Sequence, residues 1–151
     1  MDLSPLVKTV RVPLGERETF DLFTSGIGAW WPLATHSVGL DRAVDCAFEP
    51  RVGGRLFETL SDGSEKPWGV VTEWRPPRRL TFSWHPGRDA ETAQEVEVSF
   101  APEPGGGTLV RLEHRGWDLL GDEAEAMRGN YDGGWDGVLD QFVQVAEGAP
   151  V

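Results

Sequence analysis

The sequence has little cysteine and no long apolar run. Cys46 is the only cysteine among 151 residues, so no disulfide can form within the chain, and we expect a reducing, cytoplasmic compartment. We expect Cys46 to be a small buried apolar residue rather than a reactive thiol. No run of about 18 apolar residues exists, which excludes a membrane-spanning helix. The N-terminus has neither the basic start nor the apolar run of a signal peptide.

Positive charge is also scarce. Fourteen basic residues against 25 acidic ones give a net charge of −11. The electrostatic field of this negative charge repels nucleic acids and anionic membranes, so we expect neither as a partner. The motifs of a nucleophile elbow, a phosphate-binding loop and a dinucleotide site are missing. His36, His85 and His114 lack the spacing of a zinc site, so we predict no metal and no cofactor.

Seven short segments alternate apolar and polar residues, as β-strands with one buried face do. They cover residues 6–12, 43–49, 55–60, 68–74, 80–84, 94–100 and 108–114. Turn signals between them predict hairpins, and therefore an antiparallel sheet. The alternation places Val44 on the same face as Cys46, and Val70 on the same face as Trp68.

Two other segments have a helical period. Residues 16–31 carry apolar residues at helical spacing, with glycines that break the helix and Pro32 that ends it. Residues 123–146 carry one apolar stripe over five or more turns, formed by Met127, Tyr131, Trp135, Val138, Phe142 and Val145. Glycines inside this second helix each cost about 1 kcal/mol relative to alanine, so packing must stabilise it. Gly134, at the edge of the stripe, can make room beneath the helix, whereas Gly129 lies almost opposite. The alternative is a helix bent or interrupted near 129–134.

Five stretches carry a family resemblance that extends over essentially the whole chain. In order, they are AWWP, VGGRLFE, WGVVTEWRPPRRLTFSW, VEVSFAPEPGGGTLVRLEHRGW and GGWDGVLDQF. They resemble the proteins similar to the activator of the Hsp90 chaperone ATPase, which have the helix-grip fold of the START-like superfamily. The resemblance implies one α+β domain over residues 1–151. In it, a curved antiparallel sheet of about seven strands wraps around the long C-terminal helix, and a short broken helix pair follows the first strand.

The resemblance also implies an apolar cavity between sheet and helix. Nine residues are predicted to bind a ligand there: Trp30, Trp31, Phe48, Trp74, Phe82, Trp84, His114, Tyr131 and Trp135. We interpret Trp30 and Trp31 as one inward anchor and one lid residue, with a loop through His36 that can move. The alternative is that both are plain core.

The polar candidates have two interpretations each. His114 shares the buried face of its strand, where it either contacts a ligand or is a satisfied core histidine. The phenol of Tyr131 either donates a hydrogen bond to a ligand or lies at the rim of the core. Glu58 is a cavity carboxylate if Leu56 faces inward, and is solvated if Phe57 does. The sequence leaves these alternatives open.

Three functions are compatible with these patterns. The leading hypothesis is a monomer or homodimer that binds a small hydrophobic or aromatic ligand in the cavity. The second is a protein-interaction module, related to a co-chaperone, that uses an exposed Trp30–Trp31 surface to bind a chaperone or another protein. The third, less favoured, is a cyclase-like or hydrolase-like enzyme with His114 or Glu58 as general acid or base.

Overall fold

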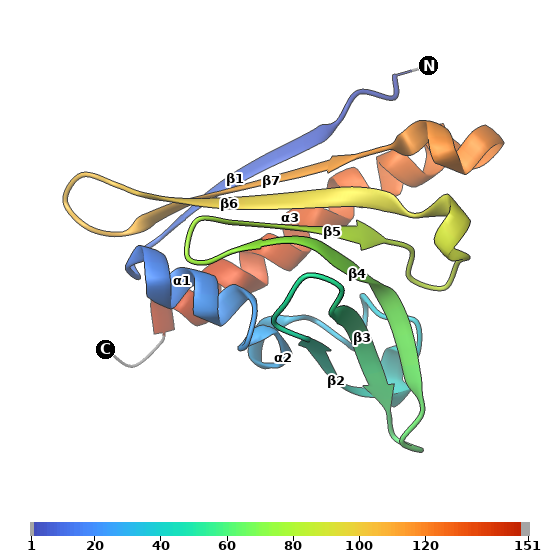
Figure 1. Cartoon of the computed structure of the whole chain (residues 1–151), viewed down its shortest axis with the longest axis horizontal. Helices are drawn as coiled ribbons and strands as arrows, with labels where there is room; N and C mark the ends of the chain where they lie inside the picture. The colour runs from blue at the N-terminus through green and yellow to red at the C-terminus, as the bar shows by residue number, and fades with distance from the viewer. Residues whose placement is uncertain (1, 149–151) are drawn as a thin grey trace.

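A seven-stranded antiparallel sheet and one long helix form most of the computed structural model, which describes residues 2–148 (Figure 1). The strands are β1 (Leu6–Val12), β2 (Ala43–Phe48), β3 (Arg55–Leu60), β4 (Glu65–Arg75), β5 (Arg79–Trp84), β6 (Gln94–Pro102) and β7 (Thr108–Arg115). The helices are α1 (Glu16–Phe23), α2 (Ile27–Trp30) and α3 (Ala124–Gly148), with short 3₁₀ turns η1 (Leu40–Arg42), η2 (Ala90–Thr92) and η3 (Trp117–Glu123). The strand order is β1-β7-β6-β5-β4-β3-β2.

This arrangement confirms the predicted helix-grip architecture. α3 runs along the apolar face of the sheet, and the broken pair α1 and α2 contacts both the sheet and α3 (Figure 1). None of the helices in residues 2–148 is long and apolar enough to cross a membrane. Residue 1 and residues 149–151, the ends of the predicted single domain, lie outside the described residues, and the expectation of one domain stays a prediction.

The break between α1 and α2 is a tight turn that requires glycine. A Cβ atom at Gly26 would lie 2.9 Å from the carbonyl oxygen of Leu22, closer than real Cβ atoms approach a neighbour. α2 then ends at Trp30, and the backbone of the next residue, Trp31, is extended. The following Pro32 favours that conformation, because its ring clashes with a preceding helical residue. The chain therefore changes direction between two adjacent tryptophans.

Two strands depart from the predicted alternation because of β-bulges. The register of β2 shifts beside Val44, which is 60% exposed although Cys46 is buried. The register of β4 shifts on both sides of Val70, so that Val71 enters the core and Val70 is exposed. A bulge adds one residue to a strand and turns the following side chains to the other face. The predicted inward positions of Val44 and Val70 are therefore wrong.

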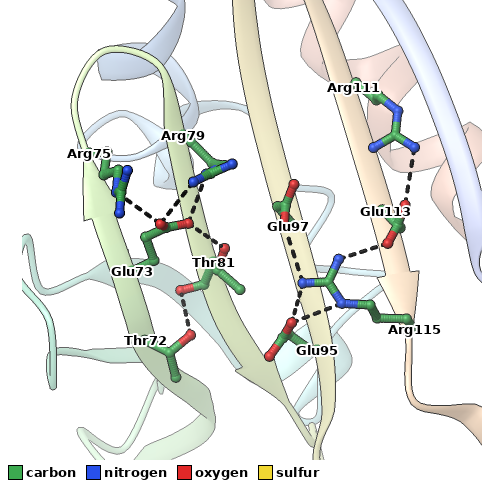
Figure 2. A network of polar contacts seen from close by, with 10 residues as sticks. All are labelled: Thr72, Glu73, Arg75, Arg79, Thr81, Glu95, Glu97, Arg111, Glu113 and Arg115. Atoms are coloured by element: carbon green, nitrogen blue, oxygen red, sulfur yellow. Dashed lines mark hydrogen bonds and ion pairs between the residues drawn. The ribbon is translucent and has the colours of Figure 1, made fainter.

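The face of the sheet opposite α3 carries a network of charged side chains (Figure 2). Arg115 makes ion pairs with Glu95, Glu97 and Glu113 on three neighbouring positions of β6 and β7. The Arg115 guanidinium lowers the pKa of Glu113, and burial opposes that shift only partly. A second group of arginines surrounds Glu73 on β4. These charges keep this face in water, so the opposite face carries the core.

α3 is one continuous helix from Ala124 to Gly148, so the alternative of an interruption near residues 129–134 is wrong. At Gly129 an added Cβ would have open space around it. We expect Gly129→Ala to raise the free energy of unfolding by about 0.5–1 kcal/mol, because alanine loses less backbone entropy in a helix. Urea denaturation measures this change.

Gly69 in β4 is the matched control. A Cβ there would lie 1.7 Å from the carbonyl oxygen of Ser83, so Gly69→Ala must destabilise the β4–β5 pair. A loss of stability in Gly129→Ala, or none in Gly69→Ala, would contradict this account of the two glycines.

A candidate ligand pocket

A partly open pocket of about 300 Å³ lies between α3, the loop that follows α2 and the turn that follows β5. Its wall consists of Trp31, Thr35, His36, Ser37, Val38, Trp68, Trp84, Pro86, Gly87, Tyr131, Gly134, Trp135 and Val138. The wall is mostly aromatic or aliphatic, with a few hydroxyl groups and one imidazole. Its volume is at the lower end of the range of roughly 300–1,000 Å³ typical of small-molecule sites.

The structure brings four of the nine predicted ligand-binding residues to this wall. These are Trp31, Trp84, Tyr131 and Trp135. The other five lie in the core or at its edge and outside the pocket lining: Trp30, Phe48, Trp74, Phe82 and His114. The expectation that Gly134 makes room beneath α3 is confirmed, because it lines the pocket and a Cβ there would meet nothing within 4 Å.

Trp30 and Trp31 turn in different directions. Trp30 is 1% exposed, packs edge-on against Phe142 and donates its N–H to the carbonyl oxygen of Leu22. Trp31, 8% exposed, lines the pocket and donates its N–H to the carbonyl oxygen of His36 at 2.7 Å. Trp30 is thus an anchor in the core, and Trp31 attaches the loop to the pocket. Since both are buried, the prediction of an exposed Trp30–Trp31 docking surface is wrong.

Glu58 is a fully buried carboxylate that holds the loop beside the pocket. It accepts hydrogen bonds from the backbone N–H of Val38 at 2.7 Å, the backbone N–H of Gly39 at 2.9 Å and the indole N–H of Trp68 at 2.6 Å. Within the described part of the chain, no cationic side chain forms an ion pair with it. Three N–H donors replace the water that a buried carboxylate loses. Glu58 therefore faces inward, but it lies behind the pocket wall.

His114 is a satisfied core histidine. It is fully buried, and its Nδ1 accepts the indole N–H of Trp135 at 2.9 Å. Since an indole N–H can only donate, the proton of the neutral ring is on Nε2, which donates to the side-chain oxygen of Gln94 at 3.3 Å. Burial lowers the pKa of His114 from its ordinary value of 6.5 to about 3. His114 thus stays neutral and fixes the orientation of Trp135.

The candidate reactive groups from the sequence do not reach the pocket. Glu58 and His114 are both absent from its wall, so an acid–base mechanism that uses these two side chains is wrong. Cys46 is buried, and burial raises the pKa of its thiol to about 12, so it is an inert core residue as expected. Among residues 2–148, no group of three or more histidine, cysteine, aspartate or glutamate side chains is placed to hold a metal ion.

Sequence reasoning missed a large part of the wall. Trp68 was recognised only as an inward strand residue, and the wall segments 35–38 and 86–87 are loops without a periodic pattern. Val138, by contrast, is part of the apolar stripe on the predicted helix. The missed residues come together only through the fold, because they lie far apart in the sequence.

Comparisons with known proteins agree with this architecture. The sequence profile of the family described as "Activator of Hsp90 ATPase homolog 1-like protein" matches residues 17–147. The chain belongs to this family. A comparison with curated proteins gives no match.

Solved structures of similar fold include a relative of clear sequence similarity. An anthrahydroquino-γ-pyrone synthase, Txn09, solved in complex with SUM, is 36% identical; the match covers 95% of this chain and 97% of that one, with a TM-score of 0.67. CalU16 from Micromonospora echinospora is 23% identical over 97% of this chain and 76% of its own, with a TM-score of 0.63. The Aha1 dimer from Colwellia psychrerythraea is 15% identical over 95% and 96%, with a TM-score of 0.70. The last two show the common fold of the family alone.

We expect Glu58→Gln to loosen the loop. An amide has one oxygen and places an NH₂ group against an N–H donor, so at least one of the three donors loses its acceptor. The expected loss in the free energy of unfolding is about 1–3 kcal/mol, with faster hydrogen exchange at the amides of Val38 and Gly39. Glu65→Gln is the control, because Glu65 forms an exposed ion pair with Arg55, worth less than about 1 kcal/mol. Unchanged exchange in Glu58→Gln would contradict the role of this carboxylate.

The buried His114 makes stability depend on pH. Because its pKa is lower in the folded state, the unfolded chain binds an extra proton as pH falls below about 6.5, and stability decreases towards acid by up to about 1.4 kcal/mol per pH unit. His114→Asn keeps an acceptor for the Trp135 N–H and does not titrate, so its unfolding free energy should decrease less between pH 6.5 and 5. Urea denaturation at several pH values measures both slopes, and equal slopes would refute the assignment.

Proposed function

We propose that this protein binds a small, planar aromatic molecule in the pocket beneath α3. The observation that carries the proposal is a wall of four indole rings in mutual contact, with ring centroids 5.0–5.9 Å apart: Trp31, Trp68, Trp84 and Trp135. Indole rings bind other aromatic rings through stacking and edge-to-face contacts in addition to apolar burial. A pocket of about 300 Å³ is suited to a molecule of two or three fused rings.

The similarity to a synthase supports the same class of ligand. That relative is named for an anthrahydroquino-γ-pyrone, which has fused aromatic rings, and it is 36% identical to this chain over nearly its whole length. We propose that binding takes place in the cytoplasm, since the only cysteine is a buried thiol. Catalysis of a reaction of the bound ligand is the second candidate function, because the relative is named as a synthase. His36 and Tyr131 are the titratable side chains on the pocket wall.

A leucine at position 134 tests the pocket. The probe is 1,8-dihydroxyanthraquinone, and its binding is followed by the quenching of tryptophan fluorescence. We expect the wild type to bind it and Gly134→Leu to bind it about tenfold more weakly or worse, because the new side chain occupies the space beneath α3.

Gly129→Leu is the matched control, since it makes the same substitution on the same helix away from the pocket. Its affinity should stay within about twofold of the wild type, because no ligand contact changes. Absence of binding by the wild type, or equal affinity in both variants, would reject the pocket as the binding site.

A further inference from the structure

The indole N–H groups on the pocket wall have different partners. Three of the four donate to protein acceptors at 2.6–2.9 Å: Trp31 to the carbonyl oxygen of His36, Trp68 to Glu58 and Trp135 to His114. The fourth, Trp84, is 3% exposed, and its N–H is buried without an acceptor anywhere in residues 2–148. A buried N–H without a partner costs free energy comparable to a lost hydrogen bond, so native proteins rarely keep one.

The Trp84 N–H lies close to a second unused polar group. The Trp84 and Tyr131 rings are 6.3 Å apart in an edge-on arrangement, and both line the pocket. The Tyr131 hydroxyl makes no hydrogen bond of normal geometry to any described residue, the Trp84 N–H included. Burial raises the pKa of Tyr131, and the nearby Trp84 N–H and Arg88 charge oppose this shift only partly. The phenol is therefore neutral and able to donate.

The charge of the protein restricts which ligand atom fits these donors. No lysine or arginine belongs to the pocket wall as described, and the chain carries a net charge of −11. The Arg88 charge that acts on Tyr131 is already paired with Glu123 at 2.8 Å, so a ligand carboxylate would enter an unfavourable field without a free counter-ion. A neutral oxygen with free lone pairs, such as a ketone oxygen conjugated to an aromatic ring, avoids that cost and accepts a hydrogen bond.

We propose that the pocket recognises neutral aromatic ketones, with the Tyr131 hydroxyl donating to the ketone oxygen and the Trp84 N–H donating to the Tyr131 oxygen. This inference rests on the proposed binding of an aromatic ligand and adds its polar group. The two hydrogen bonds form a chain that ends on the ligand, so each strengthens the other. When its proton points to the ketone, the Tyr131 hydroxyl turns its oxygen lone pairs towards the Trp84 N–H, which then has an acceptor.

Two probes that differ in one oxygen test this chain of donors. α-Tetralone carries a ketone beside its aromatic ring, and tetralin has the same carbon skeleton without the oxygen. The quantity measured by calorimetry is the preference for tetralone, which is the Kd of tetralin divided by the Kd of tetralone. Tyr131→Phe should lower this preference about three- to tenfold, because it removes the hydrogen bond to the ketone and leaves the apolar contacts.

The tryptophans supply a matched pair of variants. Trp84→Phe and Trp135→Phe each remove one indole from the wall, but only the Trp84 N–H is without a protein acceptor. We expect Trp84→Phe to lower the tetralone preference and Trp135→Phe to leave it unchanged. The affinity for tetralin reports in each variant whether the pocket is intact.

The outcomes separate this inference from the proposed function. A tetralone preference that is equal in the wild type, Tyr131→Phe and Trp84→Phe overturns the inference, and binding of 1,8-dihydroxyanthraquinone by the wild type then leaves the proposed function standing. If the wild type binds none of the three aromatic probes, the proposed function fails and the inference fails with it.

Discussion

The need of each buried indole N–H for an acceptor is the constraint on which the rest of this structure depends. Six of the seven tryptophans are buried, and five of these N–H groups have a protein acceptor. Two of these bonds join separate elements that apolar packing alone would leave free to slide. Trp30 ties α2 to α1, and Trp135 ties α3 to β7 through His114. Non-directional burial supplies most of the stability, while these directional bonds determine how the elements are aligned.

The pocket follows from the same constraint. Trp31 and Trp68 both satisfy their N–H groups through the loop after α2, the first directly at the His36 carbonyl and the second through Glu58. The loop is therefore held at a defined distance from α3, where Gly134 leaves space beneath the helix. A site built in this way is preorganised, because its side chains are held by bonds to the protein before a ligand arrives. Trp84 is the exception, and its unsatisfied donor lies where a ligand can complete the pattern.

Much of the fold could be predicted from the sequence, because strands and helices leave periodic patterns. The alternation of apolar and polar residues indicated the seven strands, and the apolar stripe over residues 123–146 indicated α3. The five stretches of family resemblance indicated the family. The position of Val70 could not be predicted, since a bulge depends on pairing with a distant strand and leaves no local pattern. The inward direction of Glu58 was undecidable for a similar reason: its partners, Val38 and Gly39, are backbone groups of a loop. Half of the candidate site lies on such loops, so sequence reasoning found most of its aromatic residues and the residues of α3, and missed Trp68 and most of the loop residues.

The most direct test of the account is a ¹H–¹⁵N spectrum of the tryptophan indole groups, recorded with and without α-tetralone. The account predicts that the Trp84 N–H resonance of the free protein has the upfield shift of a group without an acceptor. It should move downfield on addition of tetralone but not of tetralin. The resonances of Trp31, Trp68 and Trp135 should keep the shifts of hydrogen-bonded groups throughout. A Trp84 N–H that is already bonded in the free protein, or that does not respond to tetralone, would contradict the claim that the ligand completes the indole network.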